Sequence, residues 1–396
     1  MNSAYPARLL SDLADRIDYG LTASATDTPV GPKFLRITDI VPEQLDWSTV
    51  PFCKVASDEE RRKYALMPND IVIARTGATV GYSKCINHDA DVVFASYLVR
   101  VRVNSECDPM YVGYVVGSED YKEFIRANAG GAAQPNANAR VLTSYAVPLP
   151  PLSTQHKIVA ILSAYDNLIE NNNRRIRLLE EMAQRIYREW FVDFRYPGHE
   201  DVPLVDTELG PIPAGWKVGI LDDLVVLQRG FDLPKSQRGV GTVPVIAATG
   251  RHGTHSEAKV NGPGVVTGRS GSLGAVEYIA EEFWPLNTTL WVKDFRRATP
   301  ESAYFLLRNL DLAGFNSGSA VPTLNRNDIS QLAQTLPPDA LVARFSEHAR
   351  NILANVRVLE RSNEVLRATR DLLLPRVISG EVDVTDLNMA MPKAGP

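Results

Sequence analysis

Apolar residues recur every seven positions in two long stretches of the chain, over about five heptads in each. The first stretch holds two such series, Ile158, Tyr165, Asn172, Leu179, Ile186 and Leu162, Ile169, Ile176, Ala183, Trp190. The same positions recur 187 residues later as Phe345, Ile352, Leu359, Leu366, Leu373 and Ala349, Val356, Asn363, Arg370, Val377. This period predicts two helices of roughly 35–40 residues, each on the order of 55 Å long.

Neither predicted helix can bury its apolar stripe alone, and each has one partner of equal length in the chain. We therefore expect the two helices to pair as an antiparallel coiled coil about a pseudo-twofold axis. The alternative is that each helix packs only on its own globular domain. Three seam positions are polar, namely Asn172, Asn363 and Arg370. They either fix the register of the pair or lie where the seam is exposed or covered by another protein.

The segments outside the helices form an internal repeat. Leu149–Pro151 recurs as Leu336–Pro338, and the loop Arg75–Gly77 (RTG) has a counterpart in Arg269–Gly271 (RSG). Short β-rich runs punctuated by Gly, Pro and Asn, with one helix in each copy, predict globular domains of mixed α and β structure. The fold class is therefore α+β, with two homologous globular domains alternating with two long helices.

Turn and capping residues set the expected boundaries. Ser153 and Asp339 are expected N-caps, Pro197 with Gly198 should end the first helix, and Pro375 should kink or end the second. The resulting segments are a first domain (1–152), a helix (153–197), a linker (198–216), a second domain (217–338), a helix (339–380) and a tail (381–396).

Composition and charge change this picture little. The 396 residues are 44% hydrophobic, and we find no apolar run long enough to span a membrane. Asp12 and Asp15 interrupt the segment where a signal peptide needs apolar residues, so we expect a cytoplasmic protein. The three cysteines do not have the spacing of metal ligands, so we expect no metal site. The net charge of −5 argues against binding nucleic acid, but the linker and tail together contribute −6.

Catalytic motifs are missing from the sequence. It has no phosphate-binding P-loop and no metalloprotease, hydrolase or kinase signature. The tetrapeptide DPMY at Asp108 is similar to the [DN]PP[YF] motif of amino-methyltransferases, but no glycine-rich cofactor loop supports it, and a strand-end turn is favoured. We therefore expect no active site in this chain.

The repeated loops carry the candidate binding residues. Each places an arginine and a hydroxyl beside a glycine, which suits a phosphate or a base edge, although a packing role for the glycine is the alternative. Arginine and asparagine are also the side chains that pair with guanine and adenine in the major groove. The candidate DNA-contacting residues are Arg36, Arg75, Thr76, Gly77, Asn136, Asn138, Arg140, Arg251, Arg269, Ser270, Gly271, Asn325 and Arg326.

A set of phrases in fixed order resembles the specificity (S) subunits of type I restriction–modification systems. They are KFLRITDI at Lys33, PNDIVIARTGATVG at Pro68, PLPPLSTQHKIVAILSAYDNLIENN at Pro148, IYREWFVDF at Ile186, ELGPIPAGW at Glu208, TVPVIAATG at Thr242, EFWPLNTTLWV at Glu282, GSAVPTLNRNDI at Gly318 and LLLPRVISGEVDV at Leu372. The chain departs from the family pattern at Asn69, where Gly is frequent, and in a second glycine loop one residue shorter. These departures put residue-by-residue transfer of DNA contacts in doubt.

The resemblance implies a non-catalytic subunit with two target-recognition domains, each reading one half of a split site in double-stranded DNA. It also implies that the paired helices act as a spacer and recruit modification (methyltransferase) subunits, which use S-adenosylmethionine to methylate adenine. Restriction subunits driven by ATP with magnesium would add cleavage, as a defence against foreign DNA. The chain alone should bind DNA weakly, with partners supplying much of the phosphate neutralisation.

Two alternatives belong to other classes of protein. One is a self-contained DNA adenine methyltransferase that uses DPMY, and the other is a structural coiled-coil adaptor whose globular domains bind protein.

Overall fold

The computed structural model describes residues 4–87, 91–131, 135–318 and 321–387, so part of the tail and short pieces of the loops at 132–134 and 319–320 lie outside the described residues. The chain divides into two compact units, Met1–Asn172 with Ser362–Pro396, and Asn173–Arg361. Both crossings between the units fall inside the long helices α6 (Leu152–Phe191) and α10 (Asp339–Ser379). Each unit therefore consists of one globular domain and one half of each long helix.

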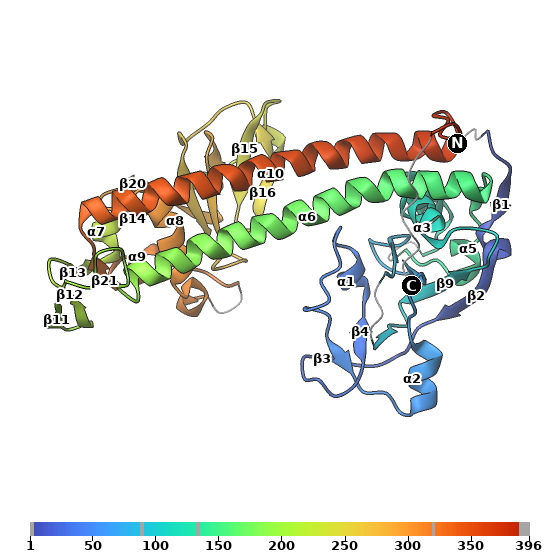
Figure 1. Cartoon of the computed structure of the whole chain (residues 1–396), viewed down its shortest axis with the longest axis horizontal. Helices are drawn as coiled ribbons and strands as arrows, with labels where there is room; N and C mark the ends of the chain where they lie inside the picture. Colours follow the sequence, from blue (N-terminus) through green and yellow to red (C-terminus); the bar gives the residue numbers. More distant parts are fainter. Residues whose placement is uncertain (1–3, 88–90, 132–134, 319–320, 388–396) are drawn as a thin grey trace. The chain divides into compact units, whose positions relative to one another are not determined.

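The first unit contains two four-stranded sheets and a two-stranded ribbon (Figure 1). One sheet has the order β2 (Ala14–Tyr19), β9 (Leu98–Val103), β6 (Ile71–Ala74), β7 (Ser83–Cys85), with all neighbours antiparallel. The other has the order β3 (Ala25–Thr26), β5 (Phe52–Cys53), β4 (Lys33–Leu35), β8 (Val92–Phe94), with β4 and β8 parallel. The ribbon pairs β1 (Ala7–Leu9) with β10 (Ala146–Pro148). The short helices are η1 (Leu10–Leu13), α1 (Ile37–Ile40), α2 (Asp58–Tyr64), α3 (Pro109–Gly117), α4 (Glu119–Asn128) and α5 (Ala139–Leu142).

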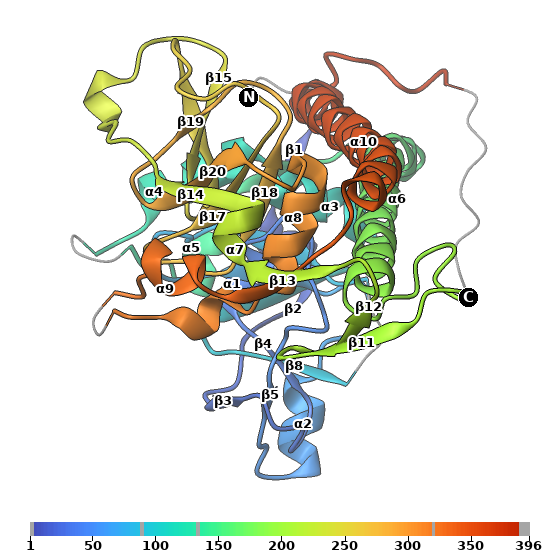
Figure 2. The same ribbon diagram turned by 90° about the vertical axis from the view of Figure 1, so that its left-hand side faces the viewer.

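The second unit repeats this plan (Figure 2). Its main sheet has the order β14 (Val225–Arg229), β20 (Thr289–Phe295), β17 (Gly264–Gly268), β18 (Val276–Ile279), again antiparallel throughout. The smaller sheet has the order β16 (Gly250–His255), β15 (Val243–Ala247), β19 (Trp284–Pro285), with β15 and β19 parallel, and a ribbon pairs β13 (Lys217–Ile220) with β21 (Ala333–Leu336). The short helices are α7 (Leu221–Leu224), η2 (Lys235–Gln237), α8 (Pro300–Asn309), η3 (Leu312–Phe315) and α9 (Arg326–Ser330). The matching strand orders confirm the α+β fold with an internal repeat.

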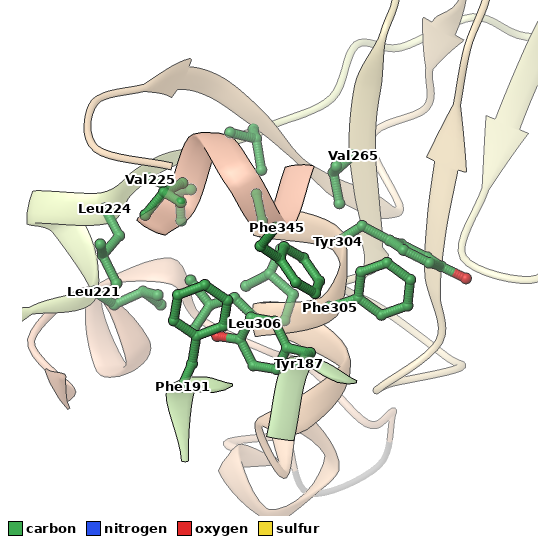
Figure 3. Close-up of a cluster of buried hydrophobic side chains, with 14 of the residues drawn as sticks. Tyr187, Phe191, Leu221, Leu224, Val225, Val265, Tyr304, Phe305, Leu306 and Phe345 are labelled. Atoms are coloured by element: carbon green, nitrogen blue, oxygen red, sulfur yellow. The ribbon is translucent and has the colours of Figure 1, made fainter. Parts of the chain in front are cut away.

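The two long helices pack together in both units, which confirms the antiparallel pair (Figure 1). In the second unit the Phe345 ring of α10 lies 5.5 Å from the Tyr187 ring of α6 and 5.2 Å from the Phe191 ring (Figure 3). All the apolar seam positions are buried or half-buried, namely Ile158, Leu162, Tyr165, Ile169, Ile176, Leu179, Ala183, Ile186, Trp190, Phe345, Ala349, Ile352, Val356, Leu359, Leu366, Leu373 and Val377. The outer seam positions belong to the cores of the two units, Ile158 and Leu162 to the first and Phe345 and Ile352 to the second.

The polar seam positions are paired with one another and with neighbouring charges inside the first unit. Asn172 Nδ2 donates a hydrogen bond of 2.9 Å to Asn363 Oδ1. Arg370 Nη1 lies 2.6 Å from Asp166 Oδ1 and 3.1 Å from Glu43 Oε1, so this arginine ties both helices to the loop after α1. Of the two interpretations left open by the sequence, the register-fixing one fits these contacts.

The helix ends differ from the expected ones because backbone carbonyls replace the expected side-chain caps. The carbonyl of Pro151 accepts hydrogen bonds from the N–H groups of Thr154 and Gln155, so α6 already includes Ser153. Asp339 is likewise the first residue of α10 rather than its N-cap.

At their other ends, α6 stops at Phe191, before Pro197, and Phe194 has a left-handed φ of 58°. Helix α10 continues through Pro375 to Ser379, because Val377 and Ile378 are fully buried in the first unit's core.

Two other local expectations are corrected. The run from Tyr111 to Ala127 is two helices, because the Ser118 hydroxyl accepts a hydrogen bond from the Tyr121 N–H and begins α4 in an extended conformation. The segment 198–216, expected as a linker, contains a hairpin of β11 (Leu204–Thr207) and β12 (Gly210–Pro213). Trp216 is 7% exposed in the core of the second unit, so this segment is part of the fold.

We predict that Phe345→Ala lowers the free energy of unfolding by about 3–5 kcal/mol, because it leaves a cavity among buried aromatic rings. Tryptophan fluorescence during urea unfolding measures the effect, since Trp190, Trp216, Trp284 and Trp291 all lie in the second unit. Val358→Ala on the same helix is the control, because Val358 is 67% exposed and its loss should change stability by less than about 0.5 kcal/mol. Equal effects of the two substitutions would contradict the buried seam.

We also predict unreactive thiols. Burial raises the pKa of Cys53 and Cys107 to about 11 and that of Cys85 to about 12. Because the thiolate is the reactive form, alkylation by iodoacetamide at pH 8 should be at least about 100-fold slower in the native chain than in urea. Fast modification of the native chain by one equivalent would show that a thiol is activated.

Candidate nucleic-acid interface

The RTG loop of the first unit is hydrogen-bonded to a second loop that lies far from it in the sequence. The loop follows β6, and the Arg75 N–H donates to the Tyr97 carbonyl at 3.0 Å. The Gly77 N–H donates to the Pro135 carbonyl at 2.9 Å, and the Ala137 N–H donates to the Arg75 carbonyl at 2.8 Å. Gly77 has a φ of 80°, a left-handed conformation that favours glycine.

The second unit forms the same hydrogen bonds at the equivalent atoms. The Arg269 N–H donates to the Thr288 carbonyl at 2.8 Å, the Gly271 N–H to the Pro322 carbonyl at 2.9 Å, and the Leu324 N–H to the Arg269 carbonyl at 2.8 Å. Gly271 has a φ of 89°. We call each such arrangement a loop pair: residues 75–77 with 135–140 in the first unit, and residues 269–271 with 322–326 in the second. Two motifs found separately in the sequence thus form one surface in each unit.

Two asparagines of the loop pairs, Asn138 and Asn325, cap short helices. Asn138 Oδ1 accepts the Val141 N–H at 3.0 Å and caps α5, and Asn325 Oδ1 accepts the Asn327 N–H at 3.1 Å and caps α9. A bidentate contact with adenine needs both the amide oxygen and the amide nitrogen, and here the cap already occupies one lone pair of the oxygen and sets the direction of the amide. Asn136 is exposed and pairs with Thr76 by a backbone bridge, as Thr323 does with Ser270.

The arginines of the loop pairs are available for a ligand. Arg140 and Arg326 lie in the first turns of α5 and α9, where both are exposed. Arg75 and Arg269 are half-buried at the ends of their strands. Within the described parts of the chain, none of the four forms an ion pair, so their charges remain unneutralised by the protein.

Arg36 and Arg251 are different, because both are neutralised within the chain. Arg36 makes two hydrogen bonds to the Asp39 carboxylate, at 2.9 and 3.1 Å, and this partner raises the pKa of the guanidinium. Arg251 Nη2 lies 2.7 Å from Glu281 Oε1. These two arginines belong to other elements than the loop pairs, and the structure does not bring them into the same cluster.

Three residues at the loop pairs were missed from the sequence. Tyr97 is 61% exposed beside Arg75, and Tyr19 places its ring 4.7 Å from the Arg75 guanidinium. Arg229 in β14 is the counterpart of Tyr19 in β2. Tyr19 precedes Gly20 and Arg229 precedes Gly230, and each of these glycines donates a backbone hydrogen bond to the neighbouring strand. A signal did exist: the dipeptides Tyr19–Gly20 and Arg229–Gly230 end equivalent strands.

The other chemical candidates have structural explanations. Asp108 is the N-cap of α3, where its carboxylate accepts the N–H groups of Met110 and Tyr111, so DPMY is a helix start rather than the expected strand-end turn. Tyr111 is fully buried, and its hydroxyl donates to the Pro148 carbonyl at 2.7 Å. Among the described residues we find no group of three potential metal ligands. None of the described helices combines the length and apolarity needed to cross a membrane.

Comparisons with known proteins show which proteins this chain resembles. Residues 41–181 match the family model of the type I restriction modification DNA specificity domain. Over 350 residues the chain is 24% identical to the type I restriction enzyme MjaIX specificity subunit of Methanocaldococcus jannaschii, covering 81% of this chain and 80% of that protein. It is 20% identical to the HindI specificity subunit of Haemophilus influenzae, covering 83% and 91%.

A solved structure shares the fold. The type I restriction–modification S subunit from M. genitalium superposes with a TM-score of 0.56, covering 95% of this chain and 96% of that one at 14% identity. These comparisons agree with the resemblance seen in the sequence: residues 41–181 match the type I restriction modification DNA specificity domain, and over 81% of its length the chain is similar to a type I specificity subunit.

Proposed function

We propose that this chain is the DNA-recognition subunit of a type I restriction–modification complex and that each loop pair contacts one half of a split target. The observation that carries the proposal is the repetition of the loop pair, with the same three backbone hydrogen bonds and an unpaired arginine on each strand end. Exposed backbone turns with arginine suit contacts to phosphates and base edges. The curated relatives are named specificity subunits, which agrees with recognition rather than catalysis.

The two half-sites should differ in sequence. Thr76, Asn136 and Ala139 in the first loop pair correspond to Ser270, Thr323 and Arg326 in the second, and the flanking Tyr19 corresponds to Arg229. Unlike side chains on a repeated backbone read unlike bases. The target is then two different short motifs separated by bases that are not read.

The remaining activities belong to partners. Modification subunits that bind the paired helices would methylate adenine with S-adenosylmethionine, and restriction subunits would supply ATP- and magnesium-dependent cleavage. Neither alternative is favoured: Asp108 caps a helix instead of holding a base, and a pure adaptor has no need for two matching loop pairs.

Sequencing of methylated adenines in a host that expresses a modification subunit tests the proposal. With this chain present, we expect a split motif to become methylated, and without it none. The double variant Arg75→Ala, Arg269→Ala should abolish the motif while the chain remains folded by circular dichroism. Full methylation of the motif with the double variant would refute the proposed function. So would the absence of any methylated motif when the natural chain is expressed with the modification subunits of its own operon.

A second prediction concerns the spacer. The chain crosses between the units only within α6 and α10, so four residues inserted into both helices beside Asn172 and Asn363 lengthen each by about 6 Å. We expect the unread spacer to grow by about one or two base pairs, at ~3.4 Å each, with both half-sites unchanged. The control is the same insertion at Glu208–Leu209, in the turn between β11 and β12, which should leave the spacer as it was. An unchanged spacer in the helix variant would contradict the ruler function.

A further inference from the structure

The Arg75 side chain is held in one position by an aromatic ring. Its guanidinium carbon lies 4.7 Å from the centre of the Tyr19 ring. Arginine stacks on aromatic rings through its planar face, which leaves the donors at its edge free to point at a ligand. The contact with the Tyr19 ring therefore restricts where the guanidinium lies before any ligand binds.

Arg75 also has a donor without a partner. Its Nε atom is buried and makes no hydrogen bond with any described residue. A buried donor without a partner costs free energy, and such groups in a folded protein call for an explanation. Since Nε is out of reach of solvent, a ligand would meet the Nη groups of this half-buried side chain, and the buried Nε shows that the protein encloses the inner part of the guanidinium rather than leaving it free in solvent.

Tyr19 is fixed on two sides. It is the last residue of β2, where it pairs with Val99 of β9, and its hydroxyl accepts the Ala139 N–H at 2.9 Å. Ala139 is the first residue of α5, which follows the second loop of the pair. Tyr19 thus joins the strand to the loop pair while its ring supports Arg75.

The second unit has no ring at this position. In the first unit Tyr19 pairs with Val99, and Val99 pairs on its other side with β6, the strand that leads into the RTG loop. In the second unit Arg229 pairs with Leu290, and Leu290 pairs on its other side with β17, the strand that leads into the RSG loop. Within the described chain, Arg229, Arg269 and Arg326 form no ion pair. Three like charges without an acidic partner suit the phosphate backbone, whose recognition needs charge and little direction.

We infer that Tyr19 is a positioning residue that makes Arg75 the base-reading arginine of the first half-site, with guanine as its partner, whereas Arg229 binds phosphate in the second half-site. Bidentate contact with guanine O6 and N7 is the commonest specific use of a fixed arginine in the major groove. This inference rests on the proposed function and adds that the flanking residue supports base recognition in the first loop pair and phosphate binding in the second.

Binding to duplexes tests the inference. The complex of this chain with its modification subunits is titrated with duplexes that carry the methylated motif, and with duplexes substituted at each position of each half-site. Arg75→Ala should lose about 10- to 100-fold of discrimination at one guanine of one half-site. Tyr19→Ala should lose discrimination at the same guanine by about 3- to 10-fold. Tyr19→Phe should restore most of it, because Phe keeps the ring and loses only the hydrogen bond from the Ala139 N–H. Arg229→Ala should weaken binding to all duplexes alike and reduce the slope of log K against log salt by about one.

Matched controls separate these effects from a general loss of charge. Arg62→Ala on α2 and Lys293→Ala on β20 each remove an exposed cation and should leave discrimination at every position unchanged. Thermal unfolding of each variant identifies misfolding, and in that case Arg75→Lys provides the second test, since Lys keeps the charge without the planar fork. Equal weakening of all duplexes by Arg75→Ala or Arg75→Lys, or lost discrimination at one base with Arg229→Ala, would overturn the inference. A natural complex without any preferred motif would instead refute the proposed function.

Discussion

The pairing of α6 with α10 is the constraint on which the rest of the structure depends. Each helix carries an apolar stripe that only the other helix and the adjoining domain cover, and the chain passes between its two units only inside these helices. Parts of the chain that are distant in sequence must therefore meet before either core is complete. Phe345 of α10 packs against both Tyr187 and Phe191 of α6, and Val377 with Ile378 belongs to the same core as Ile158. The hydrogen bond between Asn172 and Asn363 gives up apolar burial and fixes one register, since any slip would leave two amides unpaired.

Elements that repeat a residue pattern along the chain were predicted from the sequence. Elements that depend on one local hydrogen bond or packing contact were not. The heptad pattern identified both long helices, and the repeated motifs identified two matching domains of mixed structure. The break at Ser118 depends on a hydroxyl that accepts the Tyr121 N–H and donates to the Val115 carbonyl, and its sequence signal is only the short change from apolar residues to Ser118, Glu119 and Asp120. The hairpin at Leu204–Pro213 was expected as a linker because its residues are rich in Pro, Gly and acid, although Ile212 and Trp216 anchor it in the core.

The candidate site shows the same division. The RTG and RSG loops and their proline–asparagine partners were predictable because similar residue types recur in both copies. The contact of Arg75 with Tyr19, and the equivalent place of Arg229 in the second unit, follow from the register of three antiparallel strands, which brings together residues more than fifty positions apart. Register follows from side-chain packing across the sheet rather than from spacing along the chain, so a single sequence does not reveal it.

Whether an arginine of this chain is available for DNA depends on its ion pairs within the protein rather than on the total charge of the chain. In the first unit Arg100 is fully buried, bound to Asp18 at 2.7 Å, and Arg102 binds Asp70 at 2.7 Å, so these charges neutralise one another inside the domain. At the equivalent register of the second unit Trp291 replaces Arg100 and Gln228 replaces Asp18, so the same place in the sheet is filled without charge. The loop-pair arginines, in contrast, have no acidic partner in the described chain. A net charge of −5 is therefore compatible with two cationic contact surfaces, because the excess of acid is carried by segments 198–216 and 381–396.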